Sequence, residues 1–401
     1  MLSQRFFAGY PWRFVVTLLT GETVTSLERL ASGRTVTYRL NQPAVATGRV
    51  PSDDPRVNIT DVEVGLDAPH VSFADRLLYG FRREATSPDS WVCRFAGLLT
   101  QIEDTADAGQ PYSTFTAYDP WQYLFHRRLV DGTSDVGVDG LSFPAQAGNL
   151  IVEQILDAAI AVDGAAMVSY NAAGWDTTAT LSGATITDPY VIQQGTSVGE
   201  ALRQIVALGG MDIEFRPVYD PAQPGVCCTV HVHSQMGSVQ DGAPFSWDVG
   251  RSVQTITSLL DGDQLSNDVR FHTGQGGPAV TPQVDATSQT RYGVYTAEAF
   301  WPAAPNQTLA VEARAQRQLQ LRKQGRRSGR ISPNPLLSPK PFLDYGLGDR
   351  VPVHATTRLR QAVPWANDST VYQRVYGIPI VLGDDGVETV TSLVASPDGF
   401  S

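Results

Sequence analysis

Between residues 12 and 130 the chain consists of short stretches of alternating apolar and polar residues, separated by turn residues. Strands of a parallel sheet need long crossover connections, usually helices, and this stretch favours an antiparallel barrel or sandwich instead. The clearest runs are Arg13–Leu19, Thr35–Leu40, Val57–Val64, Trp91–Ile102 and Tyr112–Ala117. One helical turn is expected at 119–124, with Asp119 as its cap and Pro120 at the first helical position.

The sequence pattern changes from short strand-like runs to helical periodicity after a connector rich in Gly and Asp at 131–140. Helical periodicity predicts a helix at 149–162 and a second one that starts with the capping box of Ser197 and Glu200. The second helix ends at Gly209-Gly210, which supplies a left-handed stop. An alternating strand follows at 211–215, and residues 226–233 are its expected hairpin partner. This region is therefore predicted to be a small α+β domain.

From about residue 245 the sequence returns to strand-like runs, interrupted by one predicted helix at 308–324. The end of the chain indicates a hairpin, in which residues 371–382 and 387–394 flank the turn 383–386. We therefore predict a mainly β protein, with two barrel-like domains on either side of the α+β domain. The predicted domains are 1–134, 135–244 and 245–401.

Composition excludes several classes of protein. The 401 residues include 36 Gly and 26 Pro, and only 18% are charged, which excludes a coiled coil or a long-helix protein. The formal net charge is −11, from 41 acidic and 30 basic residues, and this disfavours general binding to nucleic-acid phosphates. No run approaches the roughly 18 apolar residues of a membrane-spanning helix, so we expect no stable membrane insertion.

The sequence indicates synthesis in a reducing compartment. The apolar run at 14–19 is too short for the core of a secretion signal, so we expect it to be a strand. The three cysteines are odd in number and two of them are adjacent, which is a poor arrangement for a disulfide framework.

Cys227, Cys228, His231 and His233 are the nearest approach to a metal cluster. Because side chains alternate along a strand, Cys227 and the two histidines would share one face and Cys228 would point to the other. Three ligands on one strand span too far for a tight tetrahedral zinc site. A two-histidine chelate stays open as an alternative, but we expect partly exposed strand histidines and predict no metal and no cofactor.

Two acidic patterns resemble sites without meeting their requirements. Asp261-Gly262-Asp263 starts like a calcium loop, but position six is Ser266 instead of Gly and position twelve is His272 instead of Glu. The pairs Asp53-Asp54 and Asp384-Asp385 lie in turns, whereas glycoside hydrolysis needs two carboxyl groups across a scissile bond. The sequence also has no nucleophile elbow, phosphate loop or zinc-protease motif. We predict no catalytic residues and no enzyme.

Basic residues gather around the end of the predicted helix at 308–324. They run from Arg314 to Arg330. Cations suit the negative end of the helix dipole, so a solvated helix end is one interpretation. A contact with DNA or with a negatively charged protein surface is the other, and both stay open.

Five motifs follow one another in the last 150 residues. They are Asn267-Asp268-Val269, Ser288 with Tyr292-Gly293, the helix at 308–324, Gly348-Asp349-Arg350-Val351, and Arg374-Val375 with Ile378. In this order they resemble the second barrel domain of baseplate hub proteins of tailed bacteriophages, often called minor tail proteins in siphophages. The preceding α+β region is similar to the domain that these hubs place between their barrels. The resemblance covers about residues 140–395, and the first 130 residues match mainly in their general pattern of short strand-like runs.

The resemblance implies a structural virion protein, the hub of the tail tip. Such a hub joins the tail tube or distal tail ring to tip or fibre proteins and lines the channel through which DNA leaves. A homotrimer is expected, because three copies with two barrels each adapt a sixfold tube to a threefold fibre. The implied partners are the distal tail protein, the tape measure protein and the tip or fibre proteins, with DNA passing without specific binding.

The implied location is the virion, after synthesis and assembly in the host bacterial cytoplasm. Two alternatives remain. One is a distal tail protein that forms a sixfold ring, and the other is a carbohydrate-binding or glycan-degrading protein of the tail tip.

Overall fold

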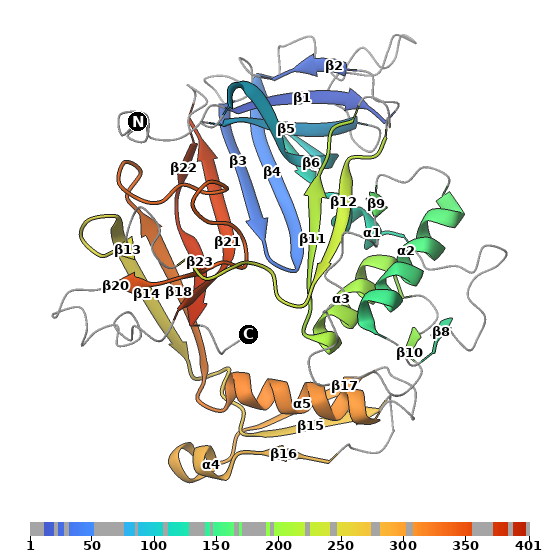
Figure 1. The fold of residues 1–401 in the computed structure, drawn as a ribbon, viewed down its shortest axis with the longest axis vertical. Coiled ribbons are helices and arrows are strands. Elements are labelled where there is room, and N and C mark those ends of the chain that lie inside the picture. The colour runs from blue at the N-terminus through green and yellow to red at the C-terminus, as the bar shows by residue number, and fades with distance from the viewer. Residues whose placement is uncertain are drawn as a thin grey trace.

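The fold is taken from a computed structural model of the chain (Figure 1). The structure describes residues 12–19, 23–27, 32–51, 76–84, 87–106, 111–127, 141–144, 147–163, 168–170, 190–192, 196–220, 225–240, 247–273, 281–301, 308–354, 372–383 and 388–397. The predicted strand at 57–64 and the paired aspartates at 53–54 and 384–385 lie outside these residues. Within the described part, the protein is mainly β, as predicted.

One thirteen-stranded sheet contains strands from both ends of the chain. Its strand order is β14-β18-β23-β21-β3-β4-β7-β6-β5-β1-β2, and β19 and β22 also pair with β21. The N-terminal strands are β1 (Trp12–Leu18), β2 (Thr23–Ser26), β3 (Ser32–Arg39), β4 (Gln42–Pro51), β5 (Arg76–Glu84), β6 (Ser87–Thr105) and β7 (Tyr112–Tyr118). The C-terminal strands are β14 (Val253–Asp261), β18 (Arg326–Pro333), β19 (Arg350–Val351), β21 (Gln373–Leu382), β22 (Glu388–Val390) and β23 (Leu393–Pro397). Each pair along this order is antiparallel.

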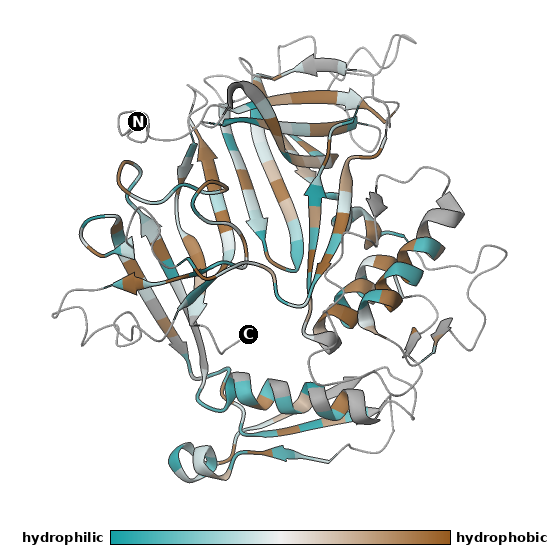
Figure 2. Cartoon of the chain, in the orientation of Figure 1, coloured by the Kyte–Doolittle hydropathy of each residue, from teal (hydrophilic) through white to brown (hydrophobic). Residues whose placement is uncertain are grey.

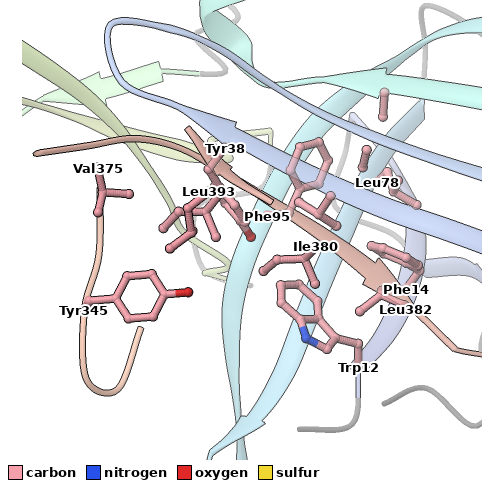
Figure 3. Packing of buried hydrophobic residues seen from close by; sticks show 14 of the residues in the cluster. Trp12, Phe14, Tyr38, Leu78, Phe95, Tyr345, Val375, Ile380, Leu382 and Leu393 are labelled. Carbon is pink, nitrogen blue, oxygen red and sulfur yellow. The ribbon is translucent and has the colours of Figure 1, made fainter. Parts of the chain in front are cut away.

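The two groups of strands meet where β21 pairs with β3. Their register sets Ile378 opposite Tyr38 and Ile380 opposite Val36. These residues belong to one core that strands of both groups share, as Figure 3 shows for Trp12 and Phe14 beside Ile380 and Leu382. Full burial of each large aliphatic or aromatic side chain contributes about 1.5–3 kcal/mol. The two ends of the chain therefore stabilise one another.

The C-terminal hairpin is present where the sequence predicted it. β21 pairs with β22 near the turn, with Leu382 opposite Glu388. Further along, β21 pairs with β23, with Gln373 opposite Pro397. The expected single partner strand at 387–394 is thus divided into two, and the pairing of β21 with β23 changes register between Val375 and Gly377.

The α+β region lies beside this sheet, at the right of Figure 1. Its elements are α1 (Pro120–Leu124), β8 (Leu141–Phe143), α2 (Gly148–Asp163), β9 (Val168–Tyr170), β10 (Tyr190–Ile192), α3 (Val198–Gly209), β11 (Asp212–Pro217) and β12 (Cys228–His233). The predicted capping of α3 is confirmed, since Ser197 Oγ accepts from the Glu200 N–H at 3.2 Å and Gly210 has a φ of 63°. The predicted hairpin is confirmed too, because β11 and β12 pair antiparallel along their length.

A smaller unit occupies the lower end of the view in Figure 1. It holds β15 (Asp268–Thr273), β16 (Gln283–Val284), α4 (Ala286–Tyr292), β17 (Thr296–Trp301) and α5 (Thr308–Arg322); β13 (Trp247–Asp248) and β20 (Val353–His354) form a separate pair. The prediction of a single helix after residue 245 is wrong, because α4 precedes α5. Its signals are local: Asp285 accepts from the Ser288 N–H at 2.8 Å, and Gly293 follows with a φ of 85°.

A second core joins the α+β region to the smaller unit. It contains Ile155 of α2, Leu202 of α3, Val230 of β12, Phe271 of β15 and Val311 of α5. Figure 2 shows the apolar bands on α2 and α3 from which such contacts are made. The domain boundaries at 134/135 and 244/245 stay a prediction. None of the helices that the structure describes is both long enough and apolar enough to cross a bilayer.

Candidate functional site

A buried carboxylate joins β11 to both halves of the large sheet. Asp212 Oδ1 accepts from Asn41 Nδ2 at 2.9 Å, and Oδ2 accepts from the Met236 N–H at 2.6 Å and from the guanidinium of Arg374. Asn41 Oδ1 in turn accepts from the Ile213 N–H at 2.9 Å. Asn41 has a φ of 55° in the turn between β3 and β4, a left-handed conformation that Asn tolerates better than most residues. Residues of β11, the β3–β4 turn and β21 are thereby fixed relative to one another.

A second buried carboxylate joins the two ends of the chain. Glu388 of β22 accepts from Arg82 of β5 through both oxygens, at 2.5 and 3.0 Å. The Trp12 indole N–H of β1 donates to the same carboxylate at 2.8 Å. Neither Arg82 nor Glu388 is more than 2% exposed. Removal of one partner would leave the other charge buried and unpaired, which is strongly destabilising.

A third carboxylate organises a close approach between two loops. Asp349 Oδ1 accepts from the Ser238 N–H at 2.7 Å, and Oδ2 accepts from the Gly346 N–H at 2.7 Å. The backbones touch here, since a Cβ on Gly237 would lie 2.2 Å from the carbonyl carbon of Gly348. Both glycines have φ near 80–90°, at 88° and 79° respectively. The Gly-Asp motif at 348–349 is thus explained by structure: the glycine allows the two backbones to touch, and the aspartate accepts hydrogen bonds from both loops.

A cavity of about 320 Å³ lies next to the first and third of these contacts, since Ile213, Met236 and Gly346 line it. Its walls come from segments 38–44, 92–96, 119–121, 213–217 and 342–347 and from Met236. They are mostly apolar or aromatic: Tyr38, Phe95, Trp121, Phe215, Phe342 and Leu347. Trp121 and Phe215 stack with ring centroids 5.2 Å apart. A small, mostly apolar cavity with a few polar groups is the general form of a binding site for a ligand or a side chain.

Asp119 is the buried polar group of this cavity. Its Oδ2 accepts from the Ala44 N–H at 2.7 Å, and its Oδ1 makes no hydrogen bond within the described part of the chain. Burial raises the pKa of Asp119 to about 7, although the Ala44, Gln122 and Trp121 N–H groups oppose the rise. The expected cap of α1 is therefore half correct: Asp119 stands at the N-cap position, but its side chain binds Ala44 and makes no cap hydrogen bond.

One wall of the cavity is strained. Phe342 has a φ of 62°, a conformation in which residues other than Gly are rare. Its ring packs edge-on against Tyr38, and the guanidiniums of Arg82 and Arg94 lie 5.5 and 5.1 Å from its centroid. The Tyr38 hydroxyl donates to the Arg94 carbonyl at 2.7 Å. Such strain persists only where surrounding contacts hold it, and it clusters at functional sites.

The candidate metal residues are scattered as strand geometry suggested. Cys228 packs in the core with α3, while Cys227 packs beside Leu77 and Tyr79 in a different cluster. His231 and His233 lie on the opposite face of β12 from Cys228, and His233 Nε2 is 3.6 Å from Glu214. Burial lowers the pKa of His231. In the residues described, no three His, Cys, Asp or Glu side chains group as metal ligands. The absence of a metal stays a prediction.

The remaining candidate residues form ordinary structural features. Asp261 makes a turn in which its Oδ1 accepts from the Asp263 N–H at 3.0 Å, as expected for a turn former and not for a calcium loop. The basic stretch 314–330 covers the end of α5 and the start of β18. Lys323 there pairs with Asp285 at 3.1 Å. None of the residues that line the cavity belongs to this basic stretch.

The cavity residues are not among the candidates from the sequence. They come from six separate segments, and each has an ordinary local role in a strand, turn or helix start. The signal that could have been used is Asp119 next to Pro120 and Trp121, because an acidic residue followed by apolar ones is compatible with a buried carboxylate. Their meeting depends on long-range strand pairing, which periodicity does not reveal.

Comparison with solved structures identifies the fold. The chain is similar to the 43 kDa tail protein of prophage MuSo2 from Shewanella oneidensis (TM-score 0.57, 10% identity, 97% of this chain and 98% of that one). It is similar to a tail protein from Neisseria meningitidis MC58 (TM-score 0.56, 12% identity, 98% of both chains). A third is prophage tail protein gp18 from Listeria monocytogenes EGD-e (TM-score 0.52, 10% identity, 97% and 95%).

These similarities extend over nearly the full length of all three chains, so the whole fold is shared and not one unit of it. No protein-family model and no curated protein matches this sequence. The chain has the fold of these phage-type tail proteins.

Proposed function

We propose that this chain is a structural virion protein, the hub of a phage tail tip or baseplate. In this role it joins the tail tube or distal tail ring to tip or fibre proteins and lines the channel through which DNA leaves. The observation that carries the proposal is the full-length fold shared with three proteins whose names describe them as tail proteins. The order of the five C-terminal motifs points the same way.

The architecture suits a part that transmits force. The two β-rich regions share one sheet and one core, and buried ion pairs at Glu388 and Asp212 cross between elements far apart in sequence. Separation of such a pair would leave a buried charge without its counter-charge, which is strongly destabilising. Local opening where these elements meet is therefore disfavoured. A rigid block of this kind is what a connector between tube and fibre requires.

The proposed assembly is a homotrimer. Three copies, each with two β-rich regions, can present six similar units to a sixfold tube and keep threefold symmetry toward a fibre. The proposed partners are the distal tail protein, the tape measure protein and the tip or fibre proteins. The net charge of −11 suits a channel through which DNA passes without being held.

Counting the copies in the tail tip by cryo-electron microscopy tests this function. Three copies around a channel are expected. Six copies in one ring would move the assignment to the distal tail protein. Clearing of host cell walls by the purified protein in zymography would favour a glycan-degrading tip protein, and we expect none.

A further inference from the structure

One side of the large sheet is covered by neutral hydroxyl and amide side chains. A row of residues that face one another crosses β3, β4, β7 and β6 and consists of Thr35, Thr47, Thr116 and Gln101. All four are partly or fully exposed, whereas their neighbours along the strands are buried in the shared core: Val36, Ala46 and Phe115. Threonine favours strand structure while it presents a hydroxyl to the outside. We call the solvent side of β14, β18, β23, β21, β3, β4 and β7 the hydroxyl face.

The C-terminal strands continue the hydroxyl face. A second row runs from β3 to β14 and consists of Arg39, Gly377, Val394, Arg330 and Thr257. All of them except Gly377 are exposed. A Cβ on Gly377 would lie 3.3 Å from the side chain of Val394, so these two positions share one side of the sheet. Since β21, β3 and β4 lie side by side (Figure 1), the hydroxyl face spans strands from both ends of the chain.

Carboxylates are missing from most of the width of this face. Six successive strands of the sheet, β18, β23, β21, β3, β4 and β7, have neither aspartate nor glutamate in their sequences, although the chain has 41 acidic residues. Exposed cations are present at Arg39, Arg49 and Arg330. The guanidinium of Arg49 lies 4.8 Å from the centroid of the Tyr112 ring, a cation–π contact. In an acidic chain, this face is therefore neutral to weakly positive.

The chemistry of the hydroxyl face fits the backbone of DNA. Contacts to DNA phosphates that carry no sequence information come from Arg, Ser, Thr and Gln side chains. The core of a protein–protein interface is more apolar than such a face. A hydroxyl that exchanges water for a phosphate gains little net free energy. Because three arginines per copy neutralise few phosphates, and the chain as a whole is acidic, contacts with DNA would be weak and independent of sequence.

We propose that the hydroxyl face lines the channel of the hub and that DNA passes along it, its phosphates making brief contacts with threonine hydroxyls and with Arg39, Arg49 and Arg330. The inference rests on the proposed hub function and names the surface that the DNA meets. Three copies would bring N-terminal and C-terminal parts of the face around the channel in turn. A dense cluster of cations would hold the DNA, whereas hydroxyl groups with few arginines let it move.

Labelling of single thiols in the assembled trimer tests where the hydroxyl face lies. In a Thr116→Cys variant of the full-length chain, biotin–maleimide should label residue 116, but streptavidin, which is wider than a DNA duplex, should not reach the label. Leu150→Cys, at an exposed position on α2, is the matched control and should accept both reagents. The unmodified chain gives the background from its own cysteines.

Each outcome of this labelling separates the inference from the hub function. A residue 116 that binds streptavidin in the trimer would lie on the outside, and one that escapes labelling would lie between copies. Either result would overturn the inference and leave the hub function standing. A chain that stays monomeric at every concentration would overturn the inference together with the trimer.

Added charge measures how the hydroxyl face acts on DNA. Thr116→Arg adds one cation per copy, and the trimer is expected to bind a short DNA duplex about tenfold or more tightly than the unmodified trimer in about 50 mM salt, and to lose this gain in about 200 mM salt. Fluorescence anisotropy measures both. Leu150→Arg adds the same charge away from the face and should change DNA binding little. Equal gains in the two variants would contradict the inference.

Discussion

Arg82 and Glu388 stand 306 positions apart in the sequence and form a two-pronged ion pair that is almost completely buried. Trp12 donates to the same carboxylate. Three strands, β1, β5 and β22, are thus joined by one side chain from the C-terminal region. Because the pair lies out of water, its stability depends on the presence of both charges.

Substitution of Glu388 should destabilise the whole fold. In Glu388→Gln the guanidinium of Arg82 stays buried without a counter-charge, and we expect a loss of roughly 3–5 kcal/mol in the free energy of unfolding. Urea denaturation measures it. The control is Arg203→Ala, which removes a surface pair with Glu200 whose Arg side chain is 61% exposed and should lose less than about 1 kcal/mol. Equal losses in the two variants would refute the assigned role of the buried pair.

Alanine at either glycine of the loop contact should be severely destabilising. In Gly237→Ala the new Cβ would lie 2.2 Å from a backbone carbon of Gly348, and in Gly348→Ala it would lie 2.5 Å from the Met236 carbonyl oxygen. Backbone would have to move in both cases, at a loss of at least about 3 kcal/mol. Gly250→Ala is the matched control, because Gly250 has a φ of 89° and no atom within 4 Å of its Cβ position. It should lose only about 1–2 kcal/mol. Thermal unfolding of the three variants distinguishes the clash from the φ penalty.

The stability of the chain should depend on pH through Asp119. Its pKa rises from 3.8 to about 7 on folding, so between these values the folded state holds a proton that the unfolded state releases. The associated stabilisation is fully present below about pH 4 and is lost as the pH rises through 7. Relative to Asp119→Asn, the native chain should lose up to about 4 kcal/mol between pH 4 and pH 8. Urea denaturation over that pH range on dilute protein measures the difference. Asp263→Asn, at an exposed turn, should give none.

The thiols should be unreactive and should hold no metal. Burial raises the pKa of Cys93 to about 12 and raises that of Cys228 well above its usual range, so thiolates are scarce at neutral pH. Thiol reagents should label the three cysteines only after unfolding. Elemental analysis should find no stoichiometric zinc, and the Cys227→Ser, Cys228→Ser double variant should match a Cys93→Ser control. Zinc that disappears only in the double variant would show a metal site.

Local features of the fold followed from the sequence. The limits of α3 are set by Ser197 and Gly210, and β11 pairs with the next strand along the chain, β12. By contrast, α4 was not predicted, since seven residues are too few for helical periodicity to stand out. Helix starts and hairpins depend on residues that are close in sequence, so local sequence patterns are enough to predict them.

The contacts between the N-terminal and C-terminal strands could not be predicted in the same way. The pairing of β21 with β3 and the contact of Asp212 with Arg374 join residues that no pattern in the sequence connects. Asp119 illustrates the limit. Its place at a helix start was visible, but its burial depends on walls from distant segments. The candidate site is thus a property of long-range pairing.

Strand β3 has two neighbours that the ribosome produces at very different times. β4 follows at once, whereas β21 begins only at residue 373. At about 5–20 residues per second, the second neighbour emerges roughly 15–70 s after β3. During that interval one edge of β3 carries open N–H and C=O groups, which readily pair with strands of other nascent chains. Crowded polysomes are therefore where this protein is most exposed to aggregation, and the danger ends only when β21 has been translated and has paired with β3.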